Sequence, residues 1–231
     1  MPSSHTRLSA VLDAVNDAHF RGEELPARDR HQAASIITSR FALPYAYADT
    51  FALCDDERKN GWKLFTGEQV QSAAARHIAG EEACRALLLL NSRDTTAQKA
   101  LSQATERLLE CLERAEANRD HRMGGNPGTF CCGPCTISVW RHLNAGGLDR
   151  REERIAGGMK ALKRARDPNT GKWRRYPFWY AISALVEMNS PEALRELKQV
   201  ARSLERAAKS DSDEKYALRR AELARRVLMR I

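Results

Sequence analysis

The sequence predicts an all-α protein, and two observations lead to this fold class. Runs of β-branched residues with alternating polarity do not occur, so the signals that identify strands are nearly absent. Apolar residues instead recur at helical spacing along much of the chain, with charged residues on the opposite face. A chain of 231 residues is long enough for a hydrophobic core that needs neither disulfide bonds nor metal.

Half-exposed helices account for most of the charged residues. Two helices are expected near the N-terminus, over about 6–20 and 27–41, followed by an irregular stretch over 42–68 with the loop sequences NGW and TGE. Amphipathic helices are expected over 95–118, 150–166, 190–209 and 213–231. Asp149 with Glu152 forms a variant of the capping box at the second of these. Ser190 followed by Pro191 marks the start of the third.

Three other segments are poor in charge on all sides, which is typical of buried helices. They cover 76–90, 134–145 and 177–188. Their alternation with the amphipathic segments predicts two layers, with the low-charge helices inside. We divide the chain into an N-terminal helical extension with an irregular linker over 1–70 and a helical-repeat domain over 71–231.

A repeat of 43 residues underlies this division. Gly128, Phe130 and Pro134 recur at the same spacing as Gly171, Trp173 and Pro177. Each proline is followed by a low-charge helix, a turn and an amphipathic helix. Glycine permits a tight turn, and proline suits the first turn of a helix because its missing N–H would have no partner there. A weaker third copy begins at NGWKLFTGE.

The segment DPNTGKWRRYPFWYAISAL, residues 167–185, resembles the glycine-x-tryptophan turn and inner helix of the α/α-toroid repeats in terpenoid cyclases and protein prenyltransferases. The resemblance implies stacked helical hairpins in a partial or open α/α toroid, with a concave surface formed by the inner helices. The chain lacks the aspartate-rich acid motif of the cyclases and the Asp–Cys–His zinc set of the prenyltransferases. The resemblance therefore concerns the fold, which by itself does not carry an activity.

The motif Cys132-Gly133-Pro134-Cys135 allows three interpretations. The leading one is packing, because the repeat accounts for its proline and cysteine is a common small buried residue. In the second, Cys132 and Cys135 form a redox or nucleophilic site, since the helix N-terminus favours a thiolate. In the third, Cys131, Cys132 and Cys135 bind a metal ion together with His121 or Cys54. The leading interpretation requires neither a metal nor a cofactor.

His77 and Glu81 form a second candidate site. Residues four apart share one face of a helix, and in an inner helix this places an imidazole and a carboxylate near the central cavity. Such a pair suits acid–base catalysis or metal binding. The preferred alternative is a surface-facing first turn in which Glu81 and Glu82 are solvated or paired with Arg85.

Aromatic residues after the second repeat turn form a third candidate site. Trp173, Trp179 and Tyr180 are candidates for lining an apolar pocket. Arg174 and Arg175 stand beside them and suit an anionic head group such as a diphosphate. The alternative is that the aromatic residues belong to the core, as aromatic residues commonly do.

The net charge of +8 is concentrated in the C-terminal part. Residues 1–148 contain 17 basic and 18 acidic side chains, whereas residues 149–231 contain 21 basic and 12 acidic. A basic segment suggests an anionic partner such as nucleic acid. The preferred interpretation is a set of solvated helix faces, because most of the basic residues alternate with acidic ones.

Three function classes follow from these observations. The leading one is a module that binds a peptide or a small apolar or anionic ligand on the concave surface of the inner helices. The second is an enzyme that acts on a prenyl-type or other hydrophobic substrate in a central cavity, and the third binds nucleic acid through residues 149–231. Binding ranks above catalysis because no recognised catalytic set is present. The sequence contains no apolar run long enough to span a membrane and no secretory signal pattern, so we expect a cytoplasmic protein with reduced thiols.

Overall fold

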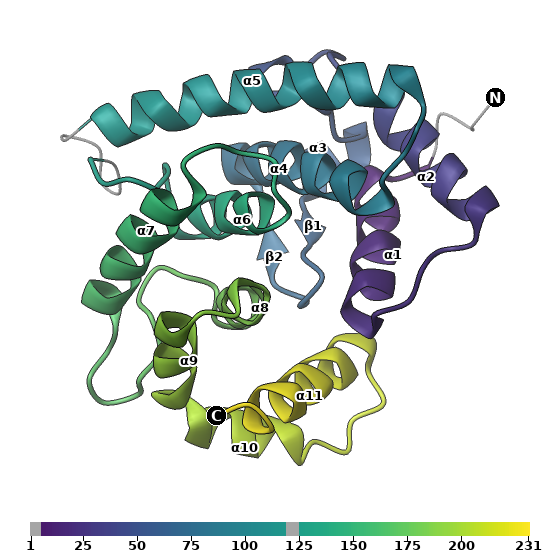
Figure 1. Cartoon of the computed structure of the whole chain (residues 1–231). Coiled ribbons are helices and arrows are strands. Elements are labelled where there is room, and N and C mark those ends of the chain that lie inside the picture. The colour runs from purple at the N-terminus through teal and green to yellow at the C-terminus, as the bar shows by residue number, and fades with distance from the viewer. Residues whose placement is uncertain (1–5, 119–124) are drawn as a thin grey trace.

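The computed structural model describes residues 6–118 and 125–231, and within them the fold is all-α (Figure 1). The first helices are α1 (Leu8–Arg21), α2 (Ala27–Thr38), α3 (Asp55–Asn60), α4 (Ser72–Leu90), α5 (Thr95–Ala117) and α6 (Gly133–Asn144). They are followed by α7 (Arg151–Ala165), α8 (Phe178–Met188), α9 (Pro191–Lys198), α10 (Ala201–Ala208) and α11 (Lys215–Leu228). The predicted fold class is confirmed.

The low-charge helices α4, α6 and α8 lie side by side. In Figure 1, α5 and α7 run along the outside of this group, and α1 lies beside α4. α4 packs against α1, α5 and α6, while α8 packs against α6, α9 and α11. Every residue of α6 from Cys135 to Leu143 is buried, as expected of a helix with apolar neighbours on several sides. Closure of these layers into a toroid stays a prediction.

The two copies of the predicted repeat turn have the same backbone conformation. Gly128 has a φ of 70° and Gly171 a φ of 71°, in the left-handed region that favours glycine. Each glycine also lies against the backbone of a helix that follows it: a Cβ atom at Gly128 would lie 1.9 Å from the carbonyl oxygen of Arg154 in α7, and one at Gly171 would lie 2.4 Å from that of Gln199 at the end of α9. The aromatic residue of each copy, Phe130 or Trp173, is buried.

Two details of the predicted helices are wrong, the cap of one and the continuity of another. Arg150, in a left-handed conformation, precedes α7, and the Asp149 side chain accepts a hydrogen bond from Arg154 instead of capping the helix. The predicted helix over 190–209 is interrupted between α9 and α10, where Val200 leaves the helical conformation and its side chain is buried. Ser190 does cap α9 by accepting a hydrogen bond from the backbone N–H of Ala193.

The segment expected to be irregular contains the 3-10 helix η1 (Tyr47–Asp49), α3 and a short antiparallel hairpin. Its strands are β1 (Trp62–Lys63) and β2 (Gln69–Val70), with Trp62 opposite Val70. The turn of the hairpin packs on α11, where Gly67 approaches the ring of Tyr216. Residues on both sides of position 70 share one hydrophobic core. The division into two domains at that position stays a prediction.

The positive charge of the C-terminal helix is largely used in binding the N-terminal part of the chain. Arg219 forms ion pairs with Asp13 and Asp17 of α1. Arg220 and Arg226 donate hydrogen bonds to the backbone carbonyl groups of Thr66 and Phe20. These contacts give the uneven charge of the chain a structural role. Among the described residues, none of the helices combines the length and the apolar character that crossing a membrane requires.

Candidate metal centre

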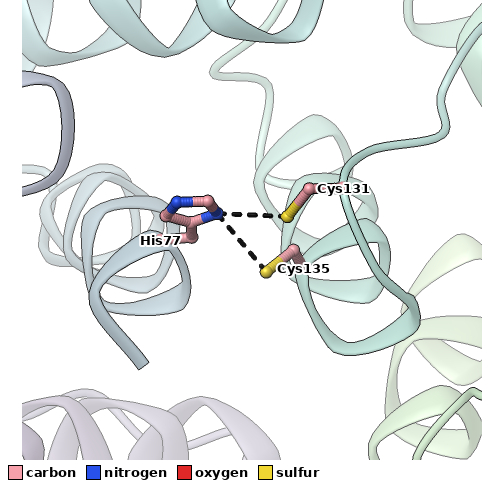
Figure 2. A group of neighbouring side chains, drawn as sticks. All are labelled: His77, Cys131 and Cys135. Atoms are coloured by element: carbon pink, nitrogen blue, oxygen red, sulfur yellow. Dashed lines mark hydrogen bonds between the residues drawn. The ribbon is translucent and has the colours of Figure 1, made fainter. Parts of the chain in front are cut away.

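One histidine and two cysteines from distant parts of the chain meet between α4 and the start of α6. His77 lies in the second turn of α4, Cys131 lies in the turn before α6, and Cys135 lies in the first turn of α6. The Nδ1 atom of His77 is 3.1 Å from the Sγ atom of Cys131 and 3.7 Å from that of Cys135. Figure 2 shows both sulfur atoms directed at the same edge of the imidazole ring. The three donor atoms lie within 4.8 Å of one another.

The local sequence accounts for the position of the cysteines. Cys132 is the residue before α6, and Pro134 lies in the first turn of that helix, where its missing N–H has no cost. Gly133 packs against the turn of the second repeat, because a Cβ atom there would lie 1.9 Å from the carbonyl oxygen of Arg175. The stacking of one repeat turn on the next therefore holds the cysteine-bearing turn in place.

Aromatic rings cover the imidazole of His77. The ring of Tyr47 lies 3.6 Å from it, centroid to centroid, and the ring of Phe130 lies 5.6 Å away. Tyr47 also forms a side-chain hydrogen bond with Cys111, to which Arg114 donates another. Burial lowers the pKa of His77 to about 4, so at neutral pH the imidazole is uncharged and has a lone pair available for a metal ion.

A third thiol extends the cluster. Cys132 forms side-chain hydrogen bonds with both Cys131 and Cys135, and these contacts lower the pKa of its thiol. The pKa of Cys131 is raised by its contact with Cys132, and that of Cys135 by its contacts with Cys131 and then Cys132. Two thiols and one neutral imidazole lie together, with the thiol of Cys132 adjoining them in the chain, and thiol sulfur and imidazole nitrogen are donors that zinc prefers.

The distances suit a tetrahedral ion. In a tetrahedral zinc site with ordinary bond lengths, a nitrogen and a sulfur ligand are separated by about 3.6 Å. The two distances from the Nδ1 atom of His77, 3.1 and 3.7 Å, lie on either side of that value. A bound ion would require movements of only a few tenths of an ångström at these atoms.

Sequence reasoning named these residues but did not combine them. His77 was paired with Glu81, whereas the structure buries Glu81 and brings its carboxylate within 2.6 Å of Nδ1 of His142. The expectation that Glu81 and Glu82 are solvated is therefore wrong, because both are only 2% exposed, whereas the expected pairing with Arg85 is present for Glu82. His121, the ligand proposed with the cysteines, lies outside the described residues. Cys54 instead precedes α3, where its backbone N–H donates to Glu57.

The predicted ligand-binding group is dispersed between the core and the surface. Trp173 is buried and donates a hydrogen bond to Glu196, and Tyr180 is buried and donates one to Glu82. Trp179 is partly buried against Phe178. Arg174 is exposed and pairs with Asp167, while Arg175 is exposed in a left-handed conformation. The polar atoms of the two buried aromatic residues are thus already bonded to carboxylates of the protein.

A buried ionic cluster between the inner helices was missed by the sequence analysis. Its members are Asn16 of α1, Glu82 and Arg85 of α4, Arg141 of α6, and Tyr180 and Glu187 of α8. Arg141 donates to Glu82 at 2.6 Å and to Glu187 at 2.9 Å. The available signal was the isolated charge in two otherwise apolar helices, Arg141 in α6 and Glu187 in α8, since buried charges must be paired.

Comparison with models of protein families, with curated proteins and with solved structures finds no match. The site is therefore interpreted from its own chemistry.

Proposed function

We propose that this protein binds a zinc ion through His77, Cys131 and Cys135, with Cys132 as the fourth ligand. The observation that carries the proposal is the approach of both sulfur atoms to one nitrogen atom of His77. Each side chain offers one donor, and the three donors come from two helical hairpins. A bound ion would therefore connect α4 to the turn before α6.

The chemistry of the donors supports zinc among the divalent ions. Thiolate sulfur and neutral imidazole are the usual ligands of structural zinc sites, whereas calcium and magnesium prefer oxygen ligands. The aromatic rings of Tyr47 and Phe130 shield the imidazole, and the burial of Cys135 shields one thiol. With four ligands from the protein, the ion would have a structural role, and its binding free energy would add to the stability of the fold.

Cys132 is assigned as the fourth ligand on its position. It adjoins Cys131 in the chain and directly precedes α6, whose first turn carries Cys135. His121 was considered for this position from the sequence. Replacing Cys132 and His121 separately tests the assignment. We expect Cys132→Ser to lower the affinity for the metal ion and a replacement of His121 to leave it unchanged.

Metal titration under reducing conditions tests the proposal. Protein purified without a histidine tag is freed of metal with a chelator and then titrated with Co²⁺, an optical substitute for Zn²⁺. We expect one ion per chain and the strong thiolate-to-metal absorption of tetrahedral cobalt, both abolished by excess Zn²⁺. Zinc at about 1,000 times its dissociation constant should stabilise the fold by about 4 kcal/mol, which raises the melting temperature by roughly 10 °C.

Matched variants locate the site. We expect His77→Gln and Cys135→Ser to weaken binding by at least about 100-fold, since each removes a ligand. The controls are His31→Gln and Cys54→Ser, whose side chains lie outside the cluster. Absence of stoichiometric binding, or equal affinity in the ligand variants and the controls, would show the proposal to be wrong.

The other function classes draw less support from the contacts. A ligand bound on the inner helices would have to compete for the charged groups of the buried ionic cluster, which are already paired with one another. A prenyl-type substrate would need Trp173 and Tyr180 at a cavity, but both are packed in the core. Nucleic-acid binding through 149–231 would rely on arginines that bind other parts of this chain, Arg219 among them.

A further inference from the structure

We propose that residues 42–50, the Tyr47 loop, cover the metal centre and must open before an ion can enter or leave. The inference rests on the proposed function for its ion, whereas the opening of the loop can be measured in the metal-free protein. The loop then controls the rate of metal exchange, while the ligands control the affinity.

The ring of Tyr47 forms the cover. It lies against the imidazole of His77, with 3.6 Å between the ring centroids and 42° between the ring planes. The ring of Phe130 meets that of Tyr47 edge-on, with 6.3 Å between the centroids. Among the proposed ligands, His77 and Cys131 are half-buried and Cys135 is buried. Tyr47 is itself half-buried, so its ring lies between the imidazole and the solvent.

The backbone of the Tyr47 loop is strained. Of the nine non-glycine residues with a positive φ in the described part of the chain, four lie in this loop: Ala42, Tyr45, Ala48 and Asp49. The other five occur singly. A left-handed conformation is unfavourable for a residue with a Cβ atom, and such residues gather in ligand clamps and switches, where the surrounding contacts hold them. The closed loop is therefore held against the preference of its own backbone.

The base of the loop is fixed. Phe41 and Phe51, on either side of it, pair as an antiparallel bridge, and their ring centroids are 5.6 Å apart. Inside the loop, η1 packs against α4, which carries His77, and against α5. The contact with α5 includes a hydrogen bond of 2.5 Å from the exposed Arg107 to the carbonyl oxygen of Asp49. The loop can therefore open at its strained middle while its base stays paired.

A cover of this kind predicts a specific change in kinetics. When an ion passes only through the open form, the rates of entry and of release are both proportional to the fraction of open loop. The dissociation constant is the ratio of the two rates, so it does not change with that fraction. A residue that only positions His77 behaves differently, because its loss raises the rate of release and leaves the rate of entry unchanged.

Rapid mixing measures both rates. Metal-free protein is mixed with Co²⁺ to follow entry, and cobalt-loaded protein is mixed with excess chelator to follow release. We expect Tyr47→Ala to raise both rates at least about 10-fold and to change the dissociation constant less than about 3-fold. Tyr47→Phe keeps the ring, and Tyr45→Ala removes a tyrosine of the same loop that is 63% exposed. Both variants should exchange the ion at the rate of the unaltered protein.

A matched pair of variants tests the strain. Ala48 has a φ of 46°, which a β-branched residue strongly disfavours, whereas Ala46 has a φ of −59° and a ψ of 142°, which valine accepts. Both alanines are half-buried. We expect Ala48→Val to shift the loop toward its open form and to speed exchange at least about 5-fold, and Ala46→Val to leave it unchanged.

Metal-free protein separates this inference from the metal proposal. Diethyl pyrocarbonate modifies accessible imidazole groups, mass spectrometry locates the modification, and the exposed His31 is the internal standard. In Tyr47→Ala and Ala48→Val, modification of His77 should become at least about 5-fold faster relative to His31, and this result supports the cover even if titration finds no metal site. Stoichiometric metal binding with an unchanged rate of entry in both variants would overturn the cover and leave the metal proposal intact.

Discussion

Replacement of Arg141 by methionine is expected to lower the free energy of unfolding by about 3–5 kcal/mol, the usual cost of leaving a buried ion pair with one charge. Arg141 is 2% exposed and donates to Glu82, Glu187 and Asn16. Burial opposes its charge, but Glu187 and Glu82 more than compensate and raise its pKa. In Arg141→Met the two carboxylates lose one of their two arginine partners and remain in the core.

Thermal unfolding measures this effect. For a chain of this size, the expected loss corresponds to a decrease in melting temperature of roughly 10 °C. The matched control is Arg195→Met, which breaks an exposed pair with Glu192 and should change stability by less than about 1 kcal/mol. Equal melting temperatures for the two variants would contradict the paired, buried state of Arg141.

Gly128→Ala is expected to destabilise the fold by about 3 kcal/mol, through left-handed strain and overpacking together. Its φ is 70°, and a Cβ atom would lie 1.9 Å from a backbone oxygen that belongs to α7. A backbone atom cannot turn aside as a side chain can, so the turn and α7 must separate. The variant therefore tests whether the repeat turn and the next hairpin are packed as closely as described.

Gly146→Ala separates the two causes. Gly146 also has a positive φ, 86°, but a Cβ atom there would meet no atom within 4 Å. It should lose only about 1–2 kcal/mol, the cost of the left-handed conformation itself. Chemical denaturation measures both variants, and a loss in Gly128→Ala no larger than that in Gly146→Ala would remove the contact from the explanation.

Much of the fold followed from local pattern. The charge-poor segments were assigned to the interior, and α4, α6 and α8 lie there. The two repeat glycines were found from their spacing alone, and both adopt the conformation that such a turn requires. The failures concern two positions: the predicted helix is interrupted at Val200, whose side chain is buried, and Asp149 binds Arg154 instead of capping α7.

The candidate site could be predicted only in pieces. The cysteines of the turn were noted as metal ligands and His77 as a ligand or base, but the sequence separates His77 from Cys131 by 54 residues. Helical spacing paired His77 with Glu81, since the two share a face. In the structure, α4 directs His77 to the cysteine-bearing turn and Glu81 to His142. One turn of helix is enough to bring two residues on the same face to different partners.

By itself, the sequence determined where most of the helices lie, which of them are buried and where the repeat turns lie. These properties depend on hydrogen bonds within a helix and on the periodicity of apolar residues, both of which act over a few positions. Only the tertiary structure decided that His77 meets Cys131 and Cys135, and that Arg141 meets Glu82 and Glu187. Those meetings depend on how the helices are rotated and packed against one another, and the spacing of residues along one helix does not specify the rotation of its neighbour.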